Sequence, residues 1–137
     1  MKSIKSKFSG SKILLVDDYM SNQVVAKEYL EIMDCNVEIA ENGEQAIAMF
    51  KERDYNLILM DLQLPKKDGY FATKTIRKIE RNKMNKVPII AVTANAMGDD
   101  KAKCLAAGMD DYISKPICVL ELEKVLSKYL NKKVINE

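Results

Sequence analysis

Asn56-Leu57-Ile58-Leu59-Met60-Asp61 is the stretch of sequence that decides the fold. Four apolar residues follow one another without polar alternation, which is typical of a strand buried on both faces. The run ends at Asp61, and Pro65, Asp68 and Gly69 follow as turn-forming residues. A carboxylate at the end of a buried strand costs free energy unless a partner compensates its charge. Asp61 therefore either caps the next turn or takes part in a binding site.

The rest of the chain repeats this pattern of short apolar runs separated by segments of helical periodicity. The expected strands lie at residues 13–16, 37–40, 57–60, 87–92 and 110–114. The expected helices lie around residues 20–33, 46–50, 72–79, 98–107 and 122–129. Strands and helices that alternate through short links predict an α/β fold, a doubly wound parallel sheet with helices on both faces.

Helical spacing also predicts which side chains face the core. In the first helix, Val25, Tyr29, Ile32 and Met33 recur at helical intervals, so we expect them to lie on its inward face. Gly108 follows the fourth helix, at a position where a left-handed cap favours glycine.

Polar residues stand at the ends of four of these strands. Asp17 and Asp18 follow the first strand, Asp61 ends the third, and Thr93 and Lys115 follow the fourth and fifth. Each has a plainer role, such as helix capping for the aspartates or an ordinary surface position for the lysine. In open parallel sheets, however, ligands bind outside the carboxyl ends of the strands. We therefore expect these five side chains to form one site.

The charges of these residues predict a metal ion. Two unit charges about 4 Å apart repel by roughly 4 kcal/mol at an effective dielectric constant of about 20, and one lysine does not balance three aspartates. Oxygen ligands that leave room for water and phosphate favour Mg²⁺, or Mn²⁺, over zinc. With the metal present, a carboxylate oxygen of Asp61 is able to attack phosphorus and form an aspartyl phosphate. Lys115 and the Thr93 hydroxyl then neutralise and position the phosphoryl group.

The composition excludes other kinds of site. The chain has no histidine and its three cysteines share no metal-ligand spacing, which excludes Ser-His-Asp and Cys-His catalysis and an ordinary zinc site. The net charge is only +2, so we expect no nucleic-acid partner. No apolar run approaches the roughly 20 residues that span a bilayer, so we expect a cytoplasmic location without membrane insertion by this segment.

In these motifs the chain resembles the receiver domains of two-component response regulators, over about residues 12 to 130. The resemblance is carried by Val16-Asp17-Asp18, Met60-Asp61 with Pro65 and Asp68-Gly69, Thr93-Ala94 and Lys115-Pro116. The segments 93–97 and 104–112 are most similar to receivers of hybrid histidine kinases. The resemblance implies a flavodoxin-like, five-stranded sheet of order 2-1-3-4-5 with five helices.

The resemblance also implies a role for each acidic residue. Asp61 is the expected phosphorylation site. Asp17 and Asp18 form the acidic pocket for Mg²⁺, in which Asp18, Asp61 and the backbone carbonyl of Gln63 are the expected direct ligands.

The remaining roles concern the phosphoryl group and its consequences. Thr93 and Lys115 are expected to hold the phosphoryl oxygens, and the peptide bond before Pro116 is expected to be cis. Thr93 and Tyr112 form the expected switch, which acts on the surface of the fourth helix, fifth strand and last helix, although a half-buried aromatic ring is also common there. Gln63 and Asn95 lie where relatives tune hydrolysis of the phosphoaspartate.

The function implied by the resemblance is that of a signal receiver in a phosphorelay. The phosphoryl group is expected to come from a phosphohistidine on a histidine kinase or a histidine phosphotransfer domain. The chain is expected to be a signalling module rather than a turnover enzyme, and a monomer or weak dimer. We expect residues 1–11 to be a tail or linker, 12–131 the receiver domain and 132–137 a second tail, in either a free-standing receiver or a part of a larger kinase.

Two other functions fit the same architecture. A Mg²⁺-dependent phosphohydrolase with an aspartyl nucleophile usually carries D-x-D after its first strand and a cap insertion, whereas this chain has adjacent aspartates and no insertion. A flavin or nucleotide binder needs a phosphate-binding loop rich in Gly, Ser or Thr after the first strand, where this chain places two negative charges.

Overall fold

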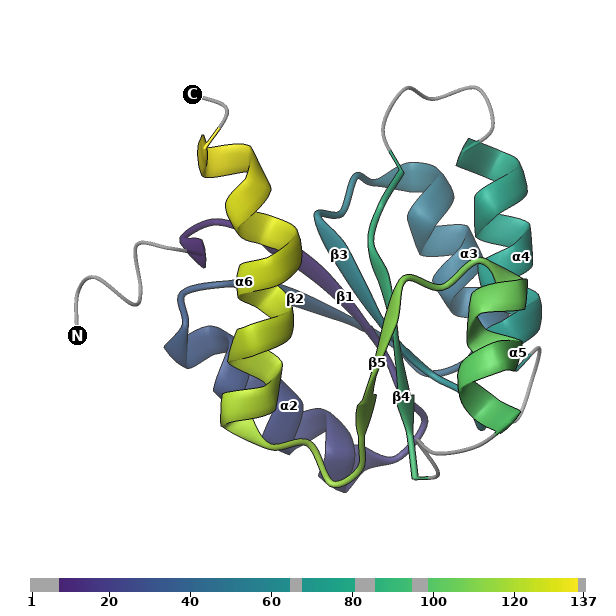
Figure 1. The fold of residues 1–137 in the computed structure, drawn as a ribbon, viewed down its shortest axis with the longest axis horizontal. Helices are drawn as coiled ribbons and strands as arrows, with labels where there is room; N and C mark the ends of the chain where they lie inside the picture. The colour runs from purple at the N-terminus through teal and green to yellow at the C-terminus, as the bar shows by residue number, and fades with distance from the viewer. Residues whose placement is uncertain (1–7, 65–67, 81–85, 95–98, 136–137) are drawn as a thin grey trace.

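The computed structural model describes residues 8–64, 68–80, 86–94 and 99–135, without the side chains of 99–100 and 131–135 (Figure 1). Expectations for Pro65 and Asn95 lie outside these residues. The strands are β1 (Lys12–Val16), β2 (Asn36–Ala40), β3 (Leu57–Asp61), β4 (Ile89–Thr93) and β5 (Asp111–Ser114). The helices are α2 (Met20–Ile32), α3 (Gly43–Glu52), α4 (Gly69–Ile79), α5 (Asp99–Ala107) and α6 (Val119–Ile135). All strand pairs are parallel and the sheet order is β2-β1-β3-β4-β5, which confirms the predicted fold.

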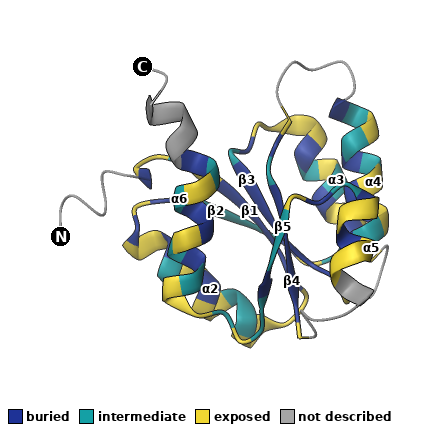
Figure 2. Cartoon of the chain, in the orientation of Figure 1, coloured by how far each residue is buried: buried dark blue, intermediate teal, exposed yellow. Residues whose placement is uncertain are grey.

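The helices form two layers, with α2 and α6 on one face of the sheet and α3, α4 and α5 on the other (Figure 1). Alternate residues of each strand supply the two cores, because successive side chains of a strand point to opposite faces. On β3, Leu57 and Leu59 pack under α2 and α6, whereas Ile58 and Met60 pack under the other three helices. The three inner strands β1, β3 and β4 are accordingly buried along their central part, whereas the edge strands β2 and β5 are only partly buried (Figure 2). The unbroken apolar run therefore serves two cores at once.

Local residues explain several of the helix ends. The side chains of Asn42 and Asp68 accept hydrogen bonds from backbone N–H groups in the first turns of α3 and α4, at 2.8 and 2.9 Å. Gly108 ends α5 with φ +106°, the left-handed cap that the sequence predicts. Within the described residues, no helix has the length and apolar character needed to cross a membrane.

The predicted inward face of α2 is partly wrong. Val25 and Ile32 are 42% and 63% exposed, whereas Ala26, Leu30 and Met33 are buried. The buried residues follow the same i, i+4, i+7 spacing, displaced by one position around the helix from the Val25 row. A small residue at Ala26 lets the helix approach the sheet, and it carries no signal in a pattern based on large apolar residues.

The segment before β1 also differs from the expected tail. Phe8 is fully buried in the core between the sheet, α2 and α6. The Ser9 hydroxyl donates to the Asp34 carboxylate at 2.8 Å, and the Gly10 N–H donates to the Asp34 carbonyl at 3.0 Å. Residues 8–11 therefore belong to the folded unit, because a single buried aromatic ring anchors a segment that is otherwise polar. The outer limits of the domain stay predictions.

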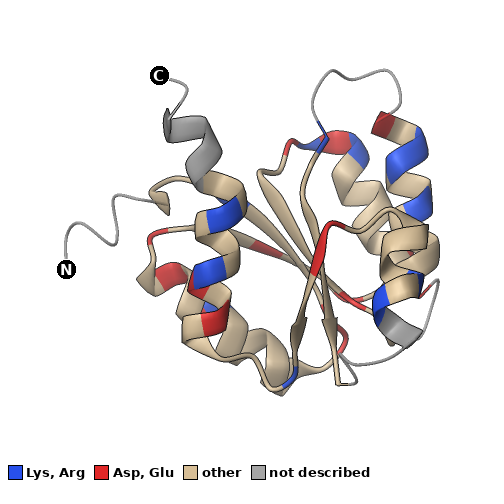
Figure 3. Cartoon of the chain, viewed as in Figure 1, with Lys and Arg blue, Asp and Glu red and all other residues tan. Residues whose placement is uncertain are grey.

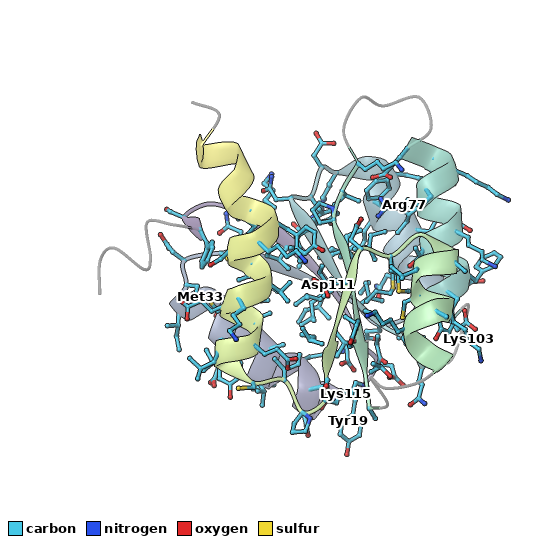
Figure 4. All side chains as sticks on the ribbon, viewed as in Figure 1. Tyr19, Met33, Arg77, Lys103, Asp111 and Lys115 are labelled. Carbon is cyan, nitrogen blue, oxygen red and sulfur yellow. The ribbon has the colours of Figure 1, made fainter. Side chains whose placement is uncertain are left out.

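At the amino end of β4, the Arg77 side chain joins three segments that are distant in the sequence (Figure 4). Its guanidinium donates to the carbonyls of Val87 and Gly108, both at 2.8 Å, and to the carboxylates of Glu80 and Asp110, at 2.7 and 2.8 Å. Glu80 is buried and accepts a hydrogen bond from the Val87 N–H. This network ties α4 to the starts of β4 and β5, at the end of the sheet opposite the carboxyl ends of the strands.

One buried hydroxyl gives a test of the packing around α4. Thr73 is fully buried, and its hydroxyl has no hydrogen-bond partner within the described part of the chain. An unsatisfied buried polar group costs about 1–3 kcal/mol, so Thr73→Val is expected to raise the free energy of unfolding by about 1 kcal/mol. Urea denaturation measures this change, and Thr75→Val on the same helix, which is less buried, is the control with an expected change within about 0.5 kcal/mol. A loss of stability in Thr73→Val would show that the hydroxyl is bonded.

Candidate functional site

The carboxyl ends of four strands bring the predicted site residues to one edge of the sheet. Asp17 and Asp18 follow β1, Asp61 is the last residue of β3, Thr93 is the last residue of β4, and Lys115 follows β5. Figure 3 shows acidic and basic segments together at the lower end of the molecule. Figure 4, drawn in the same orientation, labels Lys115 and Tyr19 at this end. Because neighbouring strands in the order β1-β3-β4-β5 are parallel, the carboxyl ends of these four strands lie at the same edge of the sheet.

The three aspartates form an oxygen cluster. One carboxylate oxygen from each of Asp17, Asp18 and Asp61 lies within 4.8 Å of the other two. Asp17 and Asp61 are each only 2% exposed, whereas Asp18 is exposed to solvent. The cluster therefore has two carboxylates fixed inside the protein and a third at its mouth.

Asp61 is held at both carboxylate oxygens. Oδ1 accepts a hydrogen bond from the Gln63 N–H at 3.0 Å, and Oδ2 accepts one from Lys115 Nζ at 3.0 Å. The ion pair with Lys115 is largely buried, so solvent screens it less than a surface pair. These contacts fix the orientation of the carboxylate, and the lysine offsets one of the three negative charges.

Asp17 is held by the start of α2. Its Oδ1 accepts a hydrogen bond from the Tyr19 N–H at 2.9 Å, and its backbone carbonyl accepts one from Gln23 Nε2 at 2.6 Å. Burial raises the pKa of the Asp17 carboxyl above its ordinary value, and the nearby charge of Asp61 raises it further. The hydrogen bond from Tyr19 opposes this shift, but the pKa remains raised. The ionised form of Asp17 is thus costly in the protein without a cation.

The other predicted residues lie on β4 and β5 or directly after β5. Thr93 is buried and pairs with Ser114 across the sheet, and its carbonyl accepts the Lys115 N–H at 2.8 Å. The peptide bond between Lys115 and Pro116 is cis. Tyr112 lies on β5, half-buried against the α3–α4–α5 side of the core, with Lys101 Nζ 6.0 Å from its ring centroid. Lys115 therefore contacts the cluster through Asp61, and Thr93 lies at the neighbouring strand end, whereas Tyr112 lies near the amino end of β5.

The oxygen cluster fits a magnesium ion. Two ligands of one Mg²⁺ lie no more than about 4.2 Å apart, because each Mg–O distance is about 2.1 Å. The spacing of at most 4.8 Å among the three carboxylate oxygens is close to this limit. The donor set is made of oxygens alone, which is the preference of Mg²⁺ and Mn²⁺. Asp17, Asp18 and Asp61 are thus suited to hold the predicted cation.

A small cavity of about 70 Å³ adjoins the cluster. It lies between the start of α2 and the segment after β5, and its polar wall consists of Asp17, Asn22 and Lys115. The apolar wall is made of Val25, Val92, Pro116 and Ile117. Sequence reasoning did not identify Asn22, Tyr19 or Gln23 as site residues. Their position in the sequence was a usable signal. They lie at the start of the helix that follows Asp17 and Asp18, and the first turns of such a helix stay close to the carboxylates at the end of the preceding strand.

The raised pKa of Asp17 leads to a prediction for the metal-free protein. A raised pKa means that the folded state binds this proton more tightly than the unfolded state, so the stability that the group contributes falls as pH rises above its ordinary value of 3.8. At neutral pH without metal, Asp17→Asn is expected to raise the free energy of unfolding by about 1 kcal/mol and Tm by a few degrees. Thermal unfolding with a chelator present measures this.

Saturating Mg²⁺ is expected to reverse the order of these stabilities, because a ligand stabilises the folded protein that binds it. Asp18→Asn is the control, with a smaller gain in the chelated protein because Asp18 is exposed. A fall in Tm of chelated Asp17→Asn would contradict the proposed repulsion.

Comparison with known proteins gives a consistent result. Residues 13–127 match the family described as "Response regulator receiver domain". The chain is 38% identical to Probable histidine kinase 1 of Oryza sativa subsp. indica, in an alignment 159 positions long that covers 92% of this chain. It spans only 16% of the length of that rice protein.

Solved structures show the same architecture. The chain is 42% identical, with a TM-score of 0.81, to the receiver domain of sensor histidine kinase PA1611 from Pseudomonas aeruginosa PAO1, whose structure has a magnesium ion coordinated in the active site cleft; 89% of this chain and 98% of that chain are covered. It is 32% identical, with a TM-score of 0.86, to a chain of the Saccharomyces cerevisiae complex between the histidine phosphotransfer protein Ypd1 and the receiver domain of Ssk1, with 91% and 92% covered.

Proposed function

Because the chain belongs to the response regulator receiver domain family, and is thus a signal receiver of two-component systems, we propose that Asp61 is the residue that accepts the phosphoryl group. The observation that carries this assignment is the position of Asp61, which is the member of the carboxylate cluster that also contacts Lys115. Phosphoryl transfer is promoted by cations that neutralise the charge of the transferred group. The oxygen cluster supplies one binding place for a cation, and the Lys115 ammonium is the other.

The transfer is a displacement at phosphorus. A carboxylate oxygen of Asp61 forms the new bond to phosphorus, and the bond from phosphorus to a histidine nitrogen of the partner breaks. The leaving nitrogen keeps the electron pair, and the ring departs as neutral imidazole with its proton on the other nitrogen. When bound by Asp17, Asp18, Asp61 and the Gln63 carbonyl, Mg²⁺ supplies the charge neutralisation that lets phosphate approach this acidic pocket.

Lys115 and Thr93 hold the product. The Lys115 ammonium, which now contacts Asp61 Oδ2, is placed to bind a phosphoryl oxygen attached to the same carboxylate. The Thr93 hydroxyl provides a second donor from the neighbouring strand end. Movement of Thr93 toward the phosphoryl group is coupled to Tyr112 on β5, which biases the surface formed by α5, β5 and α6. The domain acts as a two-state signalling module rather than as an enzyme with a diffusing substrate.

The partner that supplies the phosphoryl group docks around the mouth of the site. Exposed apolar side chains lie at or near the starts of α2 and α6, the helices that follow Asp18 and Lys115 in the chain: Met20 at 75%, Tyr19 at 62%, Val24 at 51% and Leu120 at 67%. Large apolar side chains gathered around a site mark a surface for protein contact. The Ypd1 complex, in which a phosphotransfer protein binds a receiver domain, supports a histidine phosphotransfer domain as this partner.

The proposed function is tested by intact mass after incubation with acetyl phosphate. We expect one added phosphoryl group with Mg²⁺ and none with a chelator, because bare carboxylates repel the donor. Uptake that is unchanged by the chelator would contradict the role of the metal. Continuous release of phosphate from a generic phosphoester such as p-nitrophenyl phosphate would instead indicate a phosphohydrolase.

Met20→Glu tests the docking surface. We expect transfer from a phosphorylated histidine phosphotransfer protein to slow by about tenfold or more, because a charge replaces an apolar contact. Uptake from acetyl phosphate should stay unchanged, because Met20 does not belong to the oxygen cluster. Ile32→Glu is the matched control at the far end of α2, where Ile32 is 63% exposed. If Met20→Glu and Ile32→Glu accept the phosphoryl group from the phosphotransfer protein at equal rates, this surface is not the docking site.

A further inference from the structure

Asn22 is placed where it acts on the cation site without being one of the three carboxylates. It lies in the first turn of α2, half-buried, and its side chain borders the 70 Å³ cavity together with Asp17 and Lys115. The chemistry proposed for the site gives this amide no task.

Asn22 and Asp17 line the same small cavity, and the Asn22 amide lowers the pKa of the Asp17 carboxyl against the larger effect of burial. An ionised carboxylate only accepts hydrogen bonds, so the NH₂ of the Asn22 amide is the group that is able to donate to it. The Tyr19 N–H donates to Oδ1 of the same carboxylate at 2.9 Å, so both neutral donors belong to the same stretch of chain. Gln23 Nε2 fixes the Asp17 carbonyl at 2.6 Å. The start of α2 therefore determines how Asp17 is oriented.

The three carboxylates differ in how they are held. Asp61 is fixed by Gln63 and Lys115, and Asp18 at the mouth is exposed. Asp17 is buried and has no lysine bonded to it within the described residues, so neutral donors do the orienting. A cation site gains affinity when its ligands are already aimed at the ion, and the residues that aim them are worth about 10- to 100-fold in metal affinity.

We infer that Asn22 is a positioning residue of the cation site, whose side-chain amide holds the Asp17 carboxylate toward the space shared with Asp18 and Asp61. The inference rests on the proposed function, because it deepens the account of the same metal site. Asn22 acts through Asp17 alone, and it touches neither the phosphoryl group nor the cation.

The test measures the dissociation constant of Mn²⁺ by electron paramagnetic resonance, and that of Mg²⁺ by competition, on the whole chain. Asn22→Leu has a similar size but no donor, and Asn22→Ala favours the helix. Both are expected to weaken Mn²⁺ and Mg²⁺ binding by about tenfold or more. Ser21→Ala, next to Asn22 and exposed, is the matched control with an unchanged constant. Binding within twofold of wild type in both Asn22 variants would overturn the inference.

A double-mutant cycle with Asp17→Asn separates positioning from other roles. If Asn22 acts through Asp17, then Asn22→Leu has no further effect on the dissociation constant once Asp17 is replaced. If the losses of metal affinity from the two single substitutions multiply in the double variant, Asn22 acts independently of Asp17, for example as a ligand itself. That result would overturn the inference. Wild-type protein that binds no Mn²⁺ at millimolar concentration would refute the proposed metal site as a whole, whereas normal wild-type binding with silent Asn22 variants would refute only the positioning role.

Discussion

Asp61→Asn is expected to abolish phosphoryl uptake, with a rate at least about a thousandfold below that of the wild type in the presence of Mg²⁺ and acetyl phosphate. The amide that replaces the carboxylate has no anionic oxygen to attack phosphorus. The substitution also removes one of the three carboxylates that hold the cation and the partner of Lys115. Intact mass spectrometry over time measures the rate, and the wild type should gain one phosphoryl group.

Asp68→Asn is the matched control for this experiment. Asp68 also follows β3 in the sequence, but it is exposed and its side chain accepts a hydrogen bond from the Phe71 N–H at the start of α4. Asparagine caps helices about as well as aspartate, so the fold and the uptake rate should both be kept. Phosphoryl addition to Asp61→Asn at the wild-type rate would move the acceptor role to another residue, and Asp18 would be the next to test.

The Asp61→Asn substitution also changes the stability of the folded protein, in two opposite directions. The half-buried Lys115 ammonium then lacks its carboxylate, while the repulsion between Asp17 and Asp61 disappears as well. These effects oppose each other, so the variant should stay folded with a Tm within a few degrees of the wild type. Absence of phosphorylation is therefore attributable to chemistry rather than to unfolding, and circular dichroism on the same sample checks this.

The architecture was predictable because the sequence of each buried strand, β1, β3 and β4, contains an uninterrupted run of apolar residues. Val16-Asp17 and Met60-Asp61 both mark the point where a two-sided core gives way to solvent, so the strand ends are visible in the sequence. In a parallel sheet these ends meet at one edge whatever the details of packing. The convergence of Asp17, Asp18, Asp61 and Lys115 follows from this alone, and the structure confirms it.

What the sequence did not reveal depends on single contacts between distant residues. Arg77 bonds to Gly108 and Asp110 across more than thirty positions, and no local pattern distinguishes it from a solvated helix residue. Phe8 is an isolated aromatic in a polar segment, which has no periodicity to interpret. Asn22 borders the cavity at the site only because α2 starts beside Asp17. Such contacts require the positions of both partners.

The sequence and the structure give different reasons for a glycine at position 69. In the sequence it is a turn signal after β3, which suggests that a special backbone conformation requires glycine there. In the structure it is the first residue of α4, and its φ lies outside the left-handed region. The requirement is instead one of space, because a Cβ at this position would lie 2.4 Å from the backbone oxygen of Asp61.

Gly69→Ala is therefore expected to be strongly destabilising, although it adds only one methyl group. The added carbon would also lie 3.1 Å from Leu62 Cα and 3.1 Å from Met60 Cγ, so no single side-chain rotation relieves the clash. Overpacking typically costs about 1–3 kcal/mol, and contact with backbone places this case at about 3 kcal/mol in the free energy of unfolding. Urea denaturation measures the loss. The rate of phosphoryl uptake should also fall, because relief of the clash moves the Asp61 backbone.

Gly10→Ala separates this steric effect from backbone strain. Gly10 has φ +78°, and no atom lies within 4 Å of the place that an alanine Cβ would occupy, so the substitution costs only the left-handed penalty of about 1–2 kcal/mol. Uptake by Gly10→Ala should equal that of the wild type, because Gly10 lies at the opposite end of β1 from Asp17. If Gly69→Ala loses less stability than Gly10→Ala and phosphorylates normally, then α4 does not press against the end of β3, and close packing is not what positions Asp61.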